Sequence, residues 1–284
     1  MREYFCGWYF KCQSSKKALA IIPALHRSRE NSSSSIQLIT SDGVFNASFP
    51  YESFCKHKNS FSIDIENNHF SEKGIDLCLS APDLKAVGSL KFGAFSPIKY
   101  DIMGPFKYVP FMECRHSVVS MKHTVTGKLE INGVSYFFDN DMGYIEGDRG
   151  YSFPRKYAWT QCFFENGSIM LSVASIPIGP FSFTGVIGII MLDKKEYRLA
   201  TYLGAKIRKI ENGEIIIEQG KMELSVKLIN KQALPLFAPV SGAMNRTIHE
   251  SLSCRASYSF INDGQALISF ESDNASFEYE FLDN

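Results

Sequence analysis

The sequence predicts an all-β protein, and three observations support that prediction: hairpin turn signals, strand-like flanks and the near absence of helical patterns. Turn dipeptides that favour positive φ angles recur along the 284 residues, at Asp42-Gly43, Asn132-Gly133, Asn166-Gly167, Asn212-Gly213 and Asp263-Gly264. Runs rich in β-branched residues flank them, such as Ile36–Thr40 and Glu214–Glu218. The best helical window, Lys16–Leu25, is short and contains Pro23, which interrupts an α-helix.

Many short strands at hairpin spacing indicate a sandwich or a barrel, because closing a sheet removes its exposed edges. A chain of 284 residues fits two antiparallel β-barrels in tandem better than one. Asp, Asn and Gly cluster over 140–151, so we expect domains at 1–141 and 142–284. No internal repeat is visible in the sequence.

One apolar stretch, Ile169–Leu192, contains no charged residue and is long enough to span a bilayer. Pro and Gly interrupt it within Ile176–Phe181, and Asn166-Gly167 opens it with a hairpin signal. Two buried strands joined by a turn are therefore the preferred interpretation over a transmembrane helix. We expect no integral membrane segment, which leaves peripheral membrane contact open.

Charge and cysteine usage restrict the class of protein. The chain has 30 basic and 30 acidic residues and no long run of one sign, so we expect no nucleic-acid partner. Its seven cysteines form no C-x-x-C pair, which favours free thiols in a reducing compartment. The N-terminus has no apolar segment typical of a signal peptide, so we expect a cytoplasmic protein.

Motifs for metals and nucleotides are missing from the sequence. The six histidines lack the H-E-x-x-H or Cys/His spacing of metal sites. Glycine-rich nucleotide-binding motifs and the G-x-S-x-G hydrolase elbow are also missing. The sequence therefore predicts neither a metal site nor a nucleotide cofactor.

The glycine-punctuated stretch before Tyr151 offers candidate catalytic residues, namely Glu146, Asp148 and Arg149. On a strand, Glu146 and Asp148 would share one face, because side chains two apart point the same way. Two carboxyls near an arginine can acquire different pKa values, and a general acid at neutral pH needs such a shift. The competing interpretation is a solvated, charge-balanced turn.

Aromatic and amide side chains follow on the next strand-like segment. Tyr157, Trp159 and Gln161 alternate there, so they would face a common side. An aromatic face can stabilise a carbocation through the attraction that operates in cation–π contacts. The competing interpretation is that Trp159 is an ordinary core residue.

A second strand-like stretch, 111–117, carries ionisable side chains on both faces. One face would present Glu113, Arg115 and Ser117, and the other Cys114 and His116. A buried pairing of Glu113 with Arg115 is the simpler explanation for the first face, because buried charges need partners. The spacing of Cys114 and His116 does not indicate a catalytic dyad.

Two further groups contain candidate residues. Arg246, His249 and Glu250 lie close together in the sequence, and His26 lies in the stretch Pro23–Ser28. Because charged residues mostly lie outside, we expect both groups at the solvated surface.

The segment Phe153–Cys162 resembles the F-P-x-x-W-x-W-x-Q-C signature of tocopherol cyclases. Stretches at 100–106, 110–117, 197–205 and 241–250 are similar to bacterial tocopherol cyclase-like proteins. The resemblance implies two lipocalin-like barrels packed together, an architecture also linked to carotenoid hydratases and some Diels–Alder catalysts. In a tocopherol cyclase, an acid protonates the first prenyl double bond of a prenylated hydroquinone. The phenol oxygen then captures the tertiary cation, without redox cofactor or metal.

Chemical reasoning on the residues in and around the motif assigns roles to them, since the family itself supplies no settled catalytic set. Glu146 or Asp148 would donate the proton, with Arg149 adjusting the carboxyls. Trp159 would face the cation, and Gln161 would position the phenol. We add a set of candidate substrate-binding residues: Tyr157, Glu113, His116, Arg246 and His249.

This chain departs from the plant pattern at Tyr157, Ala158 and Phe163, which leaves the substrate open. The expected function is acid-catalysed cyclisation or hydration of a prenyl double bond in a prenylated quinol or similar lipophilic molecule. A non-catalytic carrier of a hydrophobic ligand is the alternative, and an interaction protein with a filled interior is a third. An acid beside Trp159 would distinguish the enzyme from the carrier.

Overall fold

The computed structural model describes residues 3–29, 31–58, 60–110, 112–178, 181–230 and 234–281. These residues form β-strands and three short 3-10 helices, η1 (Tyr51–Ser53), η2 (Gly104–Tyr108) and η3 (Thr201–Leu203), with no α-helix among them. The predicted all-β class is therefore confirmed. The strands make two antiparallel sheets, of eleven and ten strands.

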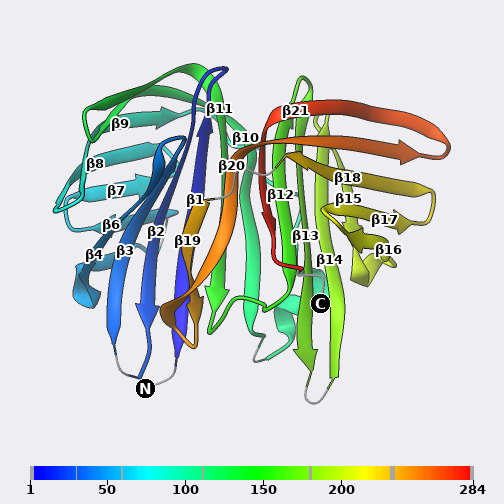
Figure 1. Ribbon diagram of the computed structural model, residues 1–284, viewed down its shortest axis with the longest axis horizontal. Helices are drawn as coiled ribbons and strands as arrows, with labels where there is room; N and C mark the ends of the chain where they lie inside the picture. The colour runs from blue at the N-terminus through cyan, green and yellow to red at the C-terminus, as the bar shows by residue number, and fades with distance from the viewer. Residues whose placement is uncertain are drawn as a thin grey trace. The chain divides into compact units, whose positions relative to one another are not determined.

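The first sheet has the strand order β4-β3-β2-β1-β11-β10-β9-β8-β7-β6-β5 (Figure 1). Its strands are β1 (Tyr4–Gln13), β2 (Ala18–Arg27), β3 (Ser32–Thr40), β4 (Gly43–Pro50), β5 (Phe54–Lys56), β6 (Ser62–Ile65), β7 (Asn68–Ser71), β8 (Gly74–Ala81), β9 (Leu84–Phe92), β10 (Cys114–Ile131) and β11 (Val134–Gly150). Apart from the pairing of β1 with β11, every neighbour in this order is a neighbour in sequence, as in a meander.

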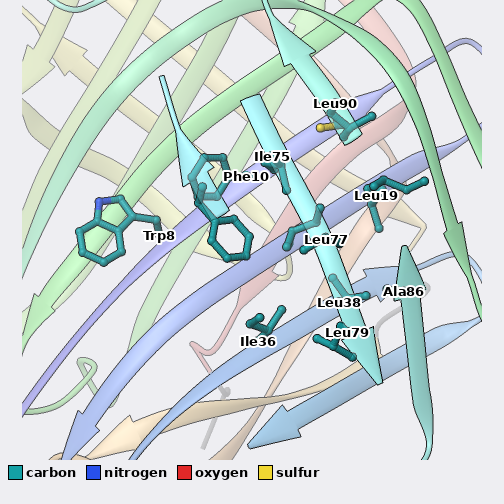
Figure 2. Close-up of a cluster of buried hydrophobic side chains, with 14 of the residues drawn as sticks. Trp8, Phe10, Leu19, Ile36, Leu38, Ile75, Leu77, Leu79, Ala86 and Leu90 are labelled. Carbon is teal, nitrogen blue, oxygen red and sulfur yellow. The ribbon is translucent and has the colours of Figure 1, made fainter. Parts of the chain in front are cut away.

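The first sheet curls around one hydrophobic cluster without closing. Figure 2 shows side chains from β1 to β3 meeting side chains from β8 and β9, among them Phe10, Leu38 and Leu77. The ring of Phe10 lies 5.7 Å from that of Phe70 and 6.2 Å from that of Phe92. The end strands β4 and β5 are not paired with each other in the described residues. The predicted barrel is thus an open, curled sheet with a filled interior.

The second sheet has the order β15-β14-β13-β12-β21-β20-β18-β17-β16, and β19 pairs with β20. Its strands are β12 (Tyr157–Phe164), β13 (Gly167–Ile178), β14 (Phe181–Leu192), β15 (Lys195–Ala200), β16 (Lys206–Glu211), β17 (Glu214–Gln219), β18 (Met222–Asn230), β19 (Leu234–Val240), β20 (Ala243–Asn262) and β21 (Gln265–Tyr279). It too is open, and it surrounds its own cluster, which includes Ile190, Ile217 and Phe260.

The chain divides into two compact units whose ranges interleave. Unit 1 consists of Met1–Ile98, Cys114–Ser152 and Phe237–Arg246, and unit 2 of Lys99–Glu113, Phe153–Leu236 and Thr247–Asn284. The predicted boundary between 141 and 142 lies within β11, and the residues up to Ser152 belong to unit 1.

The predicted turn dipeptides lie at hairpins. Asn132-Gly133, Asn212-Gly213 and Asp263-Gly264 all have positive φ angles and form two-residue loops of the kind that matches strand twist. Asp193 and Lys194 make a further turn with φ of 49° and 65°. The sequence does not predict this turn, because the turn contains no glycine.

The uncharged stretch 169–192 forms a hairpin. Strands β13 and β14 pair in continuous antiparallel register from Gly167 opposite Leu192 to Ile178 opposite Phe181. The turn expected between them, at 179–180, lies outside the described residues. Among the described residues, no helix has the length and apolar character needed to cross a membrane.

Within unit 2, Arg198 on β15 binds the segment that precedes η2, at residues 100 and 101. Its guanidinium donates to the backbone oxygens of Tyr100 (2.8 Å) and Asp101 (3.0 Å). It also pairs with Glu196 at 2.9 Å and stacks 3.6 Å from the centre of the Tyr100 ring. The family-like stretches 100–106 and 197–205 are therefore structural partners.

Candidate functional site

The candidate catalytic residues of unit 1 lie on β11. A bulge in this strand determines which of its two faces they occupy. Tyr136 and Phe138 belong to the hydrophobic cluster. Relative to β10, β11 then carries one extra residue before Asp141, where Asn140 has a φ of 52°. A one-residue shift exchanges the two faces of a strand. Beyond the bulge, Ile145 faces the cluster and the even-numbered residues face the opposite side.

His116 lies between the two carboxyls that the sequence singled out. Its Nδ1–H donates to Asp148 Oδ1 at 3.0 Å, and its Nε2 lies 3.2 Å from Glu146 Oε2, an ion pair without hydrogen-bond geometry. His116 is the register partner of Asp148 across β10 and β11. The side chains of His116 and Glu146 are 10% and 7% exposed, and that of Asp148 is 23% exposed.

Burial and charge have opposite effects on His116. Burial alone favours the neutral imidazole, but the adjacent carboxylates of Glu146 and Asp148 outweigh it and raise the pKa of His116 well above 6.5. At neutral pH the ring is therefore an imidazolium ion. The expected solvated turn around Glu146 is wrong, because Glu146 is buried within a strand.

Tyr144 completes this group, and the sequence analysis missed it. Its hydroxyl donates to Glu146 Oε2 at 2.6 Å. Burial, and then the negative charge of Glu146, raise the pKa of Tyr144 well above 10, so it remains a donor. The alternation Tyr144, Glu146, Asp148 was the available signal, since the three residues share one face. We call His116, Glu146, Asp148 and Tyr144 the His116 cluster.

Residues around the His116 cluster hold it in place. Cys114 Sγ donates to Asp148 Oδ1 at 3.4 Å, and Ser117 Oγ donates to the backbone oxygen of Gly147 at 2.8 Å. A Cβ atom at Gly147 would lie 2.8 Å from Cδ1 of Trp8, so glycine there permits close packing on β1. Cys114 and His116 thus share an acceptor in Asp148.

Arg149, predicted to adjust the carboxyls, is exposed and follows Asp148 on the opposite face of β11. Its register partners are Cys6 on β1 and Arg115 on β10. Its role therefore stays a prediction. Arg246, also in unit 1, lies near the start of β20 and is half-buried.

The aromatic and amide residues belong to unit 2. On β12, Ala158 and Cys162 face the hydrophobic cluster, so Tyr157, Trp159 and Gln161 face the other side. Trp159 is 5% exposed and Gln161 is fully buried. Neither the amide nitrogen nor the amide oxygen of Gln161 has a hydrogen-bond partner among the described residues.

Two buried glutamates accompany these residues. The Tyr157 hydroxyl donates to Glu278 on β21, and Glu278 is also the register partner of Trp159. Glu250 on β20 is the register partner of Glu278. Glu250 is 1% exposed, so its expected place at the solvated surface is wrong. The sequence analysis missed Glu278, although its alternation with Ser276 was visible.

The remaining predicted residues are distributed among other sites. Glu113 lies in a bend before β10 and belongs to unit 2, whereas Arg115 belongs to unit 1, and their pairing stays a prediction. His249 is 54% exposed and lies 3.8 Å from Glu280. His26 was expected at the surface, but it is 3% exposed and bonds to Ser35 Oγ at 3.0 Å. Burial lowers the pKa of His26 to about 4.

The acids and the tryptophan thus lie in different units, Glu146 and Asp148 in unit 1 and Trp159 in unit 2. Their expected cooperation at one substrate stays a prediction. Chemically, the His116 cluster can hold and transfer protons. Its His116, Glu146 and Asp148 ligand atoms lie within 4.8 Å of one another, and a second such group contains Cys55, His57 and Asp64.

No family model and no curated protein matches the chain. Among solved structures, the fold is similar to CghA in complex with Sch210972, with a TM-score of 0.64, 11% identity and coverage of 98% of this chain and 88% of that one. Kievitone hydratase from Nectria haematococca has a TM-score of 0.54, with 8% identity and coverage of 98% and 89%.

A Nitrosomonas europaea protein assigned provisionally to AttH has a TM-score of 0.53, with 10% identity and coverage of 99% of this chain and 93% of that one. At these identities the likenesses concern the fold alone. They agree with the predicted all-β architecture, because each likeness extends over nearly the whole chain.

Proposed function

We propose that this protein is an enzyme that protonates a carbon–carbon double bond of a lipophilic substrate and directs its cyclisation or hydration. The observation that carries the proposal is the buried imidazolium of His116 between Glu146 and Asp148. A fold shared with a kievitone hydratase supports the hydration branch of this reaction class.

Glu146 is the proposed proton donor. At rest the proton is on His116, so the proposed transfer begins with the Nε2 proton passing to Glu146 Oε2, 3.2 Å away, which leaves a neutral imidazole and a protonated Glu146. After Glu146 has protonated the substrate, its carboxylate accepts a hydrogen bond from the Tyr144 hydroxyl. Asp148 holds His116 through Nδ1 and keeps the ring oriented. Asp148 therefore acts as a positioning residue.

The proposed substrate is a quinol with a prenyl chain, as the resemblance of Phe153–Cys162 implies. The Glu146 proton adds to one alkene carbon and leaves a tertiary cation on the other. In cyclisation, the phenol oxygen bonds to the cation and returns its proton to Glu146, so the product is an isomer. In hydration, water supplies the oxygen and the returning proton.

The test is turnover of a prenylated hydroquinone by the full chain in D2O and in 18O-labelled water. Cyclisation incorporates one carbon-bound deuterium without 18O, and hydration incorporates both. Glu146→Gln should lower kcat by about 10²–10⁴-fold, the usual contribution of a general acid. The matched control is Glu130→Gln, an exposed glutamate on β10, which should leave kcat unchanged.

Two outcomes would contradict the proposal. Full activity of a folded Glu146→Gln protein would remove Glu146 from the chemistry. Tight binding of the quinol by the wild-type protein without any product would favour the non-catalytic carrier. The filled hydrophobic cluster of the first sheet is unfavourable for a carrier with its ligand in that interior.

A further inference from the structure

A second group of metal-ligating side chains lies on β5 to β7 of the first sheet, several strands away from the His116 cluster in the strand order. It consists of Cys55, His57, Asp64 and His69, which we call the Asp64 cluster. The proposed reaction uses none of these residues. Their sequence spacing matches no metal motif, so only the pairing of the strands brings them together.

Strand register places the cluster on one face. Cys55 on β5 is the partner of Asp64 on β6, and Asp64 is the partner of His69 on β7. Partners in adjacent antiparallel strands project to the same side. The intervening residues Ile63 and Phe70 are fully buried in the hydrophobic cluster, so the Asp64 cluster faces outward.

The side chains already converge on Asp64. His57 Nε2 lies 2.6 Å from Asp64 Oδ2, and His69 Nδ1 lies 2.5 Å from Asp64 Oδ1. Ligand atoms of Cys55, His57 and Asp64 all lie within 4.8 Å of one another. The backbone N–H of His57 donates to Ser62 O at 3.0 Å, which fixes His57 at the end of β5.

The donor set has the chemistry of a zinc site. Zn²⁺ binds four ligands tetrahedrally from thiolate, imidazole and carboxylate groups, and its ligand atoms lie roughly 3.4 to 3.8 Å apart. Zinc binding would require these side chains, and His69 in particular, to rotate into such spacing; the side chains of His57, Asp64 and His69 are 47%, 33% and 42% exposed. One thiolate and one carboxylate balance the charge of the ion.

We propose that Cys55, His57, Asp64 and His69 bind one zinc ion. Binding displaces one proton from the Cys55 thiol and replaces the two contacts of Asp64 with the histidines by bonds to the metal. The ion would join β5, β6 and β7. Because β5 is the terminal strand and has three residues, this link would stabilise an otherwise weakly held edge.

The test is zinc binding by the chelator-treated full chain, measured by calorimetry, with Co²⁺ absorption as a report of thiolate ligation. We expect one ion per chain, proton release on binding and a rise in Tm. Cys55→Ser and His57→Ala should each weaken binding at least about tenfold. The matched control is Cys78→Ser, which removes another exposed free thiol, on β8, and should leave the affinity unchanged.

Alkylation provides an independent measurement on the unaltered protein. Zinc should protect Cys55 from iodoacetamide, as read by peptide mass spectrometry, while Cys78 reacts at the same rate with and without the metal. Failure to bind zinc, or alkylation of Cys55 at equal rates in both conditions, would overturn the proposal. Zinc that persists in Cys55→Ser and is lost in His116→Gln would place the ion at the His116 cluster instead and would equally overturn it.

Discussion

The two sheets share one part of their strand order, although no repeat is visible in the sequence. In the first, the meander β1 to β4 is joined at β1 by β11, the second strand of a long hairpin. In the second, β12 to β15 are joined at β12 by β21, again the second strand of a long hairpin. Each sheet also surrounds its own hydrophobic cluster. Both sheets therefore contain a four-strand meander joined to a long hairpin, although they have eleven and ten strands. The side chains differ between the units as well.

Those differences concern the face turned away from the hydrophobic cluster. Unit 1 carries a buried imidazolium between two carboxyls, whereas unit 2 carries Trp159, Gln161 and paired glutamates. Five of the six histidines, at 26, 57, 69, 116 and 123, belong to unit 1. The buried cation of unit 2, Arg198, holds its proton at any physiological pH. Histidines are thus concentrated in unit 1, whereas, among the described residues, the buried charged ones of unit 2 are Arg198 and the glutamates.

The largest expected effect is a difference in kcat between variants of the buried glutamates of the two units. Glu146→Gln should lower kcat by about 10²–10⁴-fold. Glu278→Gln, which removes the acceptor of Tyr157 in unit 2, should change kcat less than about tenfold, since it lies outside the proposed proton path. Steady-state turnover of the folded variants measures both. An equal loss at the two positions would show that both units supply acid chemistry.

Next in size is the effect of removing the fixed charge. Arg198→Ala leaves Glu196 buried without its partner and removes hydrogen bonds to the backbone at residues 100 and 101. We expect a loss of about 3–5 kcal/mol in the free energy of unfolding, measured with urea. The kcat of the folded fraction should not change. A variant as stable as the wild type would mean that the contacts of Arg198 contribute nothing to the free energy of unfolding.

The pH dependence of stability should arise mainly in unit 1. The pKa of folded His26 is about 4, below the value near 6.5 of an unfolded histidine. As pH falls below 6.5, the unfolded chain therefore binds the proton first, and stability is lost down to about pH 4. At pH 5 the lowered pKa of His26 accounts for a loss of about 2 kcal/mol in the free energy of unfolding.

Urea unfolding of the wild type and of His26→Gln at pH 7 and pH 5 measures the loss of stability that is due to His26. The variant should lose less stability on acidification. An identical loss in both proteins would contradict it. His116 acts in the opposite direction. Its raised pKa means that its stabilising contribution is complete below pH 6.5 and is lost as pH rises through the pKa of the folded state.

The smallest effect should come from exposed charges of unit 2. Arg208 Nε lies 2.7 Å from Glu218 Oε1, but the two side chains are 64% and 37% exposed. Water and salt screen such a pair, so Arg208→Gln should change the free energy of unfolding by less than about 1 kcal/mol. Urea unfolding at low and high salt measures this. A larger, salt-insensitive loss would show that unit 2 also depends on its surface charges.

Local patterns were enough to predict the fold class and parts of the candidate site. Turn dipeptides have an energetic preference for positive φ, so Asn132-Gly133 and Asp263-Gly264 identified real hairpins. Period-two alternation placed Glu146 with Asp148 and Tyr157 with Trp159 and Gln161, because neighbouring residues on a strand must face opposite sides. Alternation does not reveal burial, however. The surface position predicted for Glu250 and His26 followed from the general preference of charged residues for solvent, and it was wrong because both side chains are buried.

Only the tertiary structure decided which side chains meet. His116 reaches Glu146 and Asp148 through the register of β10 and β11, and a bulge before Asp141 turns those carboxyls away from the hydrophobic cluster. Cys55, His57, Asp64 and His69 meet in the same way, across three strands. Spacing along the chain specifies the face of a residue, whereas its partners depend on strand register. Register is a property of pairing between distant segments, and a single inserted residue can reverse it.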